Sequence, residues 1–132
     1  MRTHVFRLHP GDDLRHEIEG YARAHAIPAA VILSCVGSLS HLRLRDASGV
    51  NIRDIPGEFE IVSATGTAGE HRLHIHLSCS REDLTTLGGH LTDGCIIKTT
   101  AEVVLLELDD VRFGKVFDPQ TGYNELDILP LI

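Results

Sequence analysis

One stretch of the chain repeats its apolar residues at helical spacing. Residues 14–25 place Leu, Ile, Tyr, Ala and His at relative positions 0, 4, 7, 8 and 11, which lie on one face of a helix. Asp12 precedes this stretch and is predicted to be the N-cap, since a carboxylate there accepts a hydrogen bond from the first turn. The pair Ile27-Pro28 predicts the end of the helix, because the residue before a proline avoids helical geometry.

Most of the remaining pattern is typical of β-strands. Residues 29–36 are continuously apolar with several β-branched side chains, which predicts a strand covered on both faces. Gly37 is expected to bend the chain before a second strand over residues 39–45, and Gly69-Glu70 indicates a hairpin turn. A short helix is expected near residues 82–87. The other predicted strands cover residues 3–9, 58–68, 72–79 and 95–108, and the tail has apolar residues at 113, 116 and 117 before a turn at 118–122.

Together these elements predict an α+β fold. We expect a mixed, mostly antiparallel sheet of about seven strands, with one main helix and short helices. No linker, repeat or low-complexity tract divides the chain, so residues 1–132 are expected to form a single domain. A length of 132 residues, with 42% hydrophobic and 23% charged side chains, is enough for a hydrophobic core.

The charge balance bears on the partners of the chain. Twelve Lys and Arg against 19 Asp and Glu give a net charge of −7, and only Lys98 and Lys115 are lysines. DNA binding requires cations placed against phosphates, so the composition argues against DNA as a partner of the isolated chain. Three cysteines without a C-x-x-C pair favour a reducing compartment. The first residues lack the apolar region of a signal peptide, and no apolar run is long enough to cross a bilayer, so we expect a cytoplasmic location and no membrane partner.

Three histidines form the main chemical pattern of the sequence. His74 and His76 lie two residues apart in a predicted strand, so both side chains point to the same face. His90 follows Gly88-Gly89, and the two glycines are expected to let a loop turn a third imidazole back towards the strand. Three neutral imidazoles with an open fourth position suit zinc, although nickel, iron, copper and manganese share such ligands. A zinc-bound water could then act as a nucleophile, which we state as a hypothesis.

The alternative for this pattern is structural. An isolated H-x-H on a strand is more often a solvated or hydrogen-bonded pair than a metal site, and nine histidines raise the chance of coincidence. The sequence contains no Ser-His-Asp order, phosphate-binding glycine loop or nucleotide fingerprint. The catalytic residues are therefore unknown, and the sequence does not decide whether the protein is an enzyme.

The order of these motifs resembles a known family. The H-x-H pair at residues 74–76, the Gly-Gly-His-Leu at 88–91 and the Thr-Thr-Ala-Glu-Val-Val-Leu at 99–105 are similar to the PPC domain (plants and prokaryotes conserved). The segments 30–39 and 117–126 fit as well, so the resemblance spans nearly the whole chain. It implies a homotrimer, and in some prokaryotic members a metal held by histidines matching His74, His76 and His90. It also implies a DNA-binding label, but this chain lacks the Arg-Gly-Arg-Pro segment of an AT-hook.

Two further residues are candidates for a ligand pocket or for outer contacts to the metal ligands. Glu102 stands in an apolar strand, where its carboxylate could hydrogen-bond a ligand histidine or face a pocket between subunits. Ser78 shares the strand face of His74 and His76 by parity. We expect the chain to bind a divalent metal, with zinc as first candidate, and a small ligand or partner at the subunit cleft. The alternatives are a DNA-associated regulator, a metal-dependent hydrolase or lyase, and a purely structural trimer-forming module.

Overall fold

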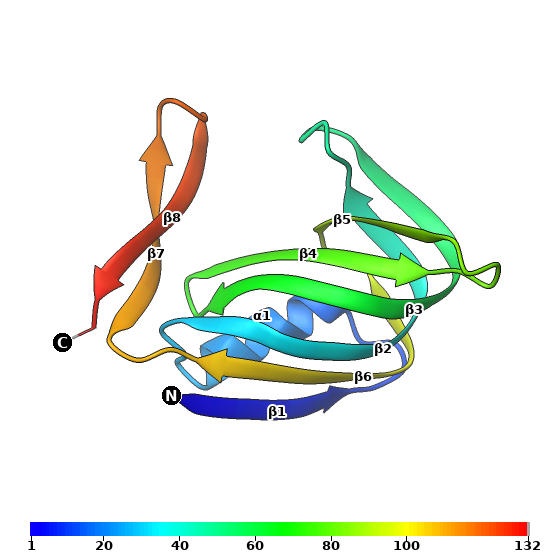
Figure 1. Ribbon diagram of the computed structural model, residues 1–132, viewed down its shortest axis with the longest axis horizontal. Coiled ribbons are helices and arrows are strands. Elements are labelled where there is room, and N and C mark those ends of the chain that lie inside the picture. Colours follow the sequence, from blue (N-terminus) through cyan, green and yellow to red (C-terminus); the bar gives the residue numbers. More distant parts are fainter. Residues whose placement is uncertain (132) are drawn as a thin grey trace.

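The computed structural model describes residues 1–131. Within them the chain forms one helix and eight strands, arranged in two sheets (Figure 1). This confirms a mostly antiparallel sheet fold with one helix, although the strands number eight rather than seven and every strand pairing is antiparallel. The elements are β1 (Arg2–Leu8), α1 (Leu14–Ala24), β2 (Ala30–Arg45), β3 (Ile52–Gly69), β4 (Arg72–Ser80), β5 (Thr86–Leu91), β6 (Ile96–Glu107), β7 (Val111–Asp118) and β8 (Tyr123–Pro130).

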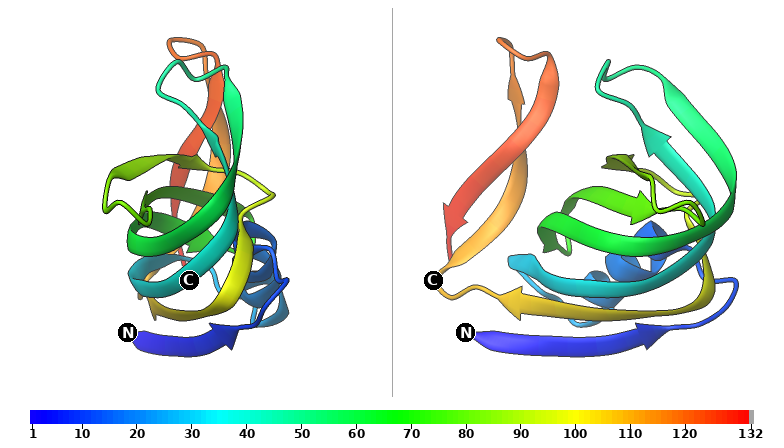
Figure 2. Two further views of the ribbon diagram at one scale, coloured as in Figure 1. Left: turned by 90° about the vertical axis from the view of Figure 1, so that its right-hand side faces the viewer. Right: turned by 45° about the vertical axis from the view of Figure 1, so that its right-hand side comes forward.

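Six of the strands form one curled sheet. Their order is β1-β6-β2-β3-β4-β5, and the far end of β2 has a third partner, β5. The pairing of β2 with β5 bends the sheet round on itself, as the side views show (Figure 2). The helix α1 packs on one face through Leu14, Ile18 and Ala22, which are fully or almost fully buried. The histidines of β4 lie on the opposite face, because Ile75 and Leu77 between and beside them are buried in the core.

The helix begins and ends slightly differently from the prediction. Its N-cap is Asp13, whose side chain accepts a hydrogen bond from the backbone N–H of His16 at 3.1 Å, so the prediction of Asp12 was wrong. Asp12 instead accepts from the backbone N–H of His9 and closes the preceding turn. The helix ends at Ala24, before Ile27-Pro28 is reached.

The apolar run at residues 29–36 belongs to a longer strand than expected. β2 continues without a break through Gly37 to Arg45, because the missing side chain at Gly37 lets β6 come close. A Cβ on Gly37 would lie 2.0 Å from the carbonyl oxygen of Thr100. Within one chain, one face of this segment is open: Leu33 is 58% exposed and Val36 is 51% exposed. The expectation of cover on both faces is therefore not met inside the monomer.

The segment expected to form a short helix does not do so. Residues 81–85 form a turn, in which Asp83 accepts hydrogen bonds from the backbone N–H and the hydroxyl of Thr85, and β5 follows at once. Asp83 was thus a turn residue rather than part of a helix.

The last two strands form a separate two-stranded ribbon. β7 and β8 pair only with each other and stand up beside the six-stranded sheet (Figure 1). The base of the ribbon is fixed to the sheet, since the backbone N–H of Phe113 donates to the carbonyl of Pro28 at 3.0 Å and the Phe113 side chain is buried. The ribbon therefore lies beside the face of the sheet that carries the histidines.

The three cysteines are buried and free. Burial raises the pKa of the Cys35 and Cys95 thiols to about 11 and that of the Cys79 thiol to about 12. At neutral pH they are protonated and serve as small core side chains. Among residues 1–131, no helix is both long and apolar enough to span a membrane.

Candidate metal centre

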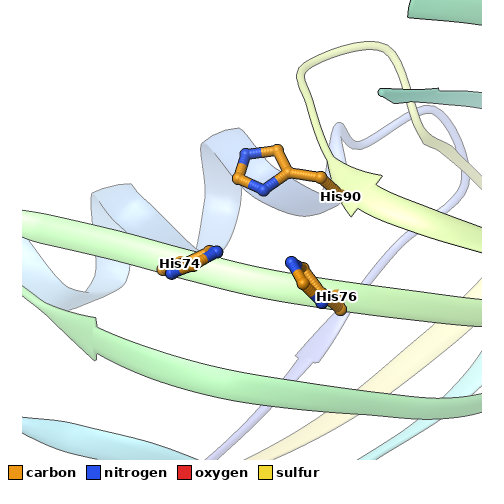
Figure 3. Close-up of side chains that lie close together, drawn as sticks. All are labelled: His74, His76 and His90. Atoms are coloured by element: carbon orange, nitrogen blue, oxygen red, sulfur yellow. The ribbon is translucent and has the colours of Figure 1, made fainter. Parts of the chain in front are cut away.

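The three histidines come from two neighbouring strands. His74 and His76 project from β4 on the same face, because side chains in a strand alternate. His90 lies in β5 directly opposite His76 in the antiparallel register. The rings of all three surround a common space above the sheet (Figure 3). The structure therefore brings together the three residues that the sequence singled out.

The distances between the rings are short enough for one ion. One nitrogen from each imidazole lies within 4.8 Å of the others. The ring centroids are 5.1 Å apart for His74–His76 and for His74–His90, and 5.6 Å apart for His76–His90. Bonds of 2.0–2.1 Å at tetrahedral angles would place the nitrogens about 3.4 Å apart. The nitrogens would therefore come closer by up to about 1.4 Å around an ion.

Gly88 and Gly89 allow this arrangement because they lie inside a strand, not because they form the hinge of a loop. A Cβ on Gly88 would lie 2.4 Å from the carbonyl oxygen of Leu77, and one on Gly89 would lie 2.6 Å from the carbonyl oxygen of Arg45. Both glycines are inside β5, between β4 on one side and the end of β2 on the other. The expectation that His90 stands on a loop was wrong: the glycines remove side chains that would hold the strands apart.

The electrostatic setting keeps two of the imidazoles neutral. Burial, followed by the charge of Arg45, lowers the pKa of His90 to about 4. Burial and the charge of Arg72 also lower the pKa of His74. In addition, the Nδ1 atom of His90 is buried and has no hydrogen-bond partner among the described residues. Neutral imidazoles with free nitrogen lone pairs are the form that binds a metal.

Several charged residues that the sequence analysis did not select lie beside His74 and His90. They line a cavity of about 270 Å³ between the histidine face and the β7–β8 ribbon. Arg45 faces His90 across the β2–β5 pairing, a contact between distant segments that no local pattern predicts. Arg72 stands two residues before His74 and could have been placed there by strand parity. The charged and triad residues that line this cavity are Arg45, Arg72, His74, His90, Lys115 and Glu125.

The two outer candidates lie at different distances from the triad. Ser78 is on the histidine face of β4, one strand step beyond His76, and is paired in register with Gly88. Glu102 is exposed on β6, where it is paired with Arg7 and Val36. Since β2 and β3 separate β6 from β4, the structure does not bring Glu102 to the triad within one chain. A role for Glu102 in a pocket between subunits stays a prediction.

Comparison with known proteins identifies relatives over the whole chain. The chain is 41% identical to a bifunctional protein GlmU of Synechococcus sp.; the match covers 99% of this chain but only 21% of that protein. The chain thus spans about a fifth of the length of this curated relative. A solved hypothetical protein of Salmonella enterica has a TM-score of 0.95 and 33% identity, with 99% of this chain and 95% of that chain covered.

A metal-containing protein of Archaeoglobus fulgidus also has this fold, with a TM-score of 0.79 and 26% identity over 96% of this chain and 93% of its own. The family model for the Plants and Prokaryotes Conserved (PCC) domain matches residues 1–109. The matched residues include the three histidines and end before the β7–β8 ribbon, so the tail segment 117–126 lies outside them. The chain therefore belongs to the PCC domain family, as its histidine and glycine motifs indicated.

Proposed function

We propose that this PCC-domain protein binds a divalent metal ion, with zinc as the first candidate, through His74, His76 and His90. The observation that carries the proposal is the convergence of three imidazole nitrogens within 4.8 Å. The buried, unpartnered Nδ1 of His90 supports it, because a buried polar atom is normally satisfied by some partner. The metal-containing relative of Archaeoglobus fulgidus, which has the same fold, supports it as well.

Three protein ligands leave room for a further one. In zinc sites with three protein ligands the fourth position holds water or a substrate, and the metal acts there as a Lewis acid. We propose that this position serves a small ligand. A hydrolase or lyase activity would need an acid or base within hydrogen-bond reach of that position as well. Glu125 is the only carboxylate among the described residues that line the adjoining cavity.

The metal proposal is tested by the metal content of untagged protein. Wild-type protein is loaded with zinc, desalted and measured by element analysis, and we expect about one zinc per chain. The variant His74→Ala/His76→Ala/His90→Ala should retain none. A matched control replaces three exposed histidines elsewhere, His9, His16 and His71, and should retain the wild-type amount. Equal zinc in the triad variant and the wild type would refute the site.

We propose further that the chain associates with copies of itself as a homotrimer. Val5, Leu33 and Val36 are 70%, 58% and 51% exposed on β1 and β2. Val5 and Val36 point away from α1, because their neighbours His4 and Cys35 are the buried ones. The apolar patch and the triad therefore both lie on the face of the sheet that is opposite α1. An interface on this patch would remove apolar surface from water.

The assembly is tested by light scattering coupled to size exclusion. A trimer would have three times the 14.5 kDa mass of one chain. Val36→Lys should lower the mass towards that of the monomer, because a charge would then be buried in the interface. Val50→Lys is the control, since Val50 is 78% exposed in the turn before β3. A monomeric wild type, or a Val36→Lys variant that stays trimeric, would contradict the proposal.

A further inference from the structure

The cavity beside the triad has an unusual charge for this chain. The protein carries a net charge of −7, yet Arg45, Arg72 and Lys115 all line this cavity, with Glu125 as the one opposing charge. Within residues 1–131, none of these three cations forms a salt bridge. Of the nine other Lys and Arg side chains, five are paired with carboxylates: Arg15, Arg23, Arg43, Arg53 and Lys98.

The two arginines are held close to the histidines by the strand register. Arg45 is directly opposite His90 on the neighbouring strand, and Cβ atoms of such pairs lie roughly 5 Å apart. Arg72 precedes His74 by two residues and so shares its face. The Nε atom of Arg45 is buried without a hydrogen-bond partner in the described part of the chain. This guanidinium is placed in the protein without the acceptor that a buried N–H requires.

A bound metal would make this charge imbalance larger. Three neutral imidazoles leave the charge of a divalent ion uncompensated, and like charges nearby would oppose its binding. An anion in the cavity would resolve both features, since it would accept hydrogen bonds from these cations and could supply an oxygen ligand to a metal bound by the histidines. Arginine is well suited to this role, because its planar donors match the oxygens of a carboxylate or a phosphate.

We propose that this cavity binds a small oxyanion, a molecule with a carboxylate or phosphate group, that is held by Arg45, Arg72 and Lys115 and completes the coordination of the triad metal. This inference rests on the proposed metal site and names the class of its ligand. The volume of about 270 Å³ is slightly below the roughly 300–1,000 Å³ of pockets for drug-sized ligands. It admits a small metabolite or the charged end of one.

Coupling between metal and anion is the measurable consequence. Because the anion contacts both the metal and the cations, each ligand should increase the affinity for the other by the same factor. We expect a coupling of about 10-fold or more, within the usual range for linked sites. The metal-free cavity should still bind the anion weakly through its cations.

The test is calorimetric titration of inorganic phosphate and, separately, of acetate into zinc-loaded and metal-free protein. Zinc loading should tighten the binding of at least one of the two anions about 10-fold. The anion that binds more tightly identifies the group as phosphate or carboxylate. Arg45→Gln and Arg72→Gln should weaken binding to the zinc-loaded protein by about 10-fold each, while the zinc content stays unchanged.

Two variants keep the result independent of folding defects. Lys115→Gln removes an exposed cation of the cavity and should weaken anion binding without affecting the fold. Arg112→Gln is the matched control, because Arg112 is an exposed cation on the same strand β7 that does not line the cavity. Its affinity for the anion should equal that of the wild type.

The outcomes separate this inference from the metal proposal. Protein that retains no zinc refutes the metal site itself. Protein that retains zinc but binds neither anion, or binds them equally well with and without Arg45, Arg72 and Lys115, overturns the oxyanion pocket alone. Equal anion affinity of the zinc-loaded and metal-free forms overturns the coupling that the proposal requires.

Discussion

Gly89 gives a sharp test of how the triad is assembled. A Cβ at this position would lie 2.6 Å from the carbonyl oxygen of Arg45, which is 0.8 Å closer than the 3.4 Å at which ordinary contact begins. Since the obstacle is backbone, Gly89→Ala must move β5 away from β2 by most of this distance. His90 follows Gly89 directly and moves with it. Metal–ligand bonds tolerate deviations of only about 0.2 Å, so a shift several times larger should weaken the site.

The expected effect is a loss of zinc affinity with a smaller loss of stability. A displaced ligand should cost at least as much as a disturbed outer partner of a ligand, which is about 10- to 100-fold in metal affinity. The strain of forcing a methyl group into a packed position is about 1–3 kcal/mol. Zinc affinity is measured by competition with a chromophoric chelator, and stability by denaturant unfolding of the metal-free protein.

The control is Gly20→Ala on α1. A Cβ there meets nothing within 4 Å, and alanine in place of a helical glycine stabilises by about 0.5–1 kcal/mol. This variant should bind zinc as the wild type does. If Gly89→Ala folds with wild-type stability and wild-type zinc affinity, then the close approach of β5 and β2 does not position His90, and the reasoning fails.

Three further results are expected. Free zinc at 100 times its dissociation constant should stabilise the protein by about 2.7 kcal/mol and raise its melting temperature by roughly 10 °C; calorimetry of the triad variant should show no such rise. In the metal-free protein, His90 has a pKa of about 4 when folded and about 6.5 when unfolded. The unfolded chain therefore takes up protons first as the pH falls from 6.5 to 4, and stability should decrease over this window. Denaturant midpoints measured at several pH values should show a smaller decrease for His90→Gln, and an unchanged decrease would contradict the assignment. Fluorescence anisotropy at physiological salt should show no binding to A·T-rich duplex DNA, because the net charge of −7 opposes phosphate contacts; tight, sequence-selective binding would contradict this.

Local patterns were sufficient for most of the fold. The helical spacing located α1 and its buried face, and the turn at Gly69-Glu70 correctly joined β3 and β4. The errors arose where distant strands decide the outcome. Gly37 was expected to separate two strands, but its close contact with Thr100 on β6 keeps β2 in one piece. Likewise β5 has a weak strand pattern and is fixed by its partners β4 and β2.

The candidate site was predictable in part for the same reason. Strand parity put His74 and His76 on one face, and this needed only the local sequence. The position of His90 opposite His76 depends on the register between β4 and β5. The glycines make this register possible, but it cannot be predicted from them. Arg45 and Lys115 were missed because they come from β2 and β7, elements that approach the triad only in the folded chain. Charged residues that meet only in the folded chain, from segments far apart in the sequence, produce no periodic pattern in the sequence.

The ribbon of β7 and β8 has a consequence for how ligand preference could change in this family. The matched family residues end at position 109, whereas Lys115 and Glu125 reach the cavity from beyond that point. The residues matched by the family model would thus hold the metal ion, and residues of the ribbon would help to determine which anion binds. Substitutions in the ribbon could alter which oxyanions bind while leaving the histidine cluster intact. The last twenty or so residues are therefore the natural place to engineer a different anion preference.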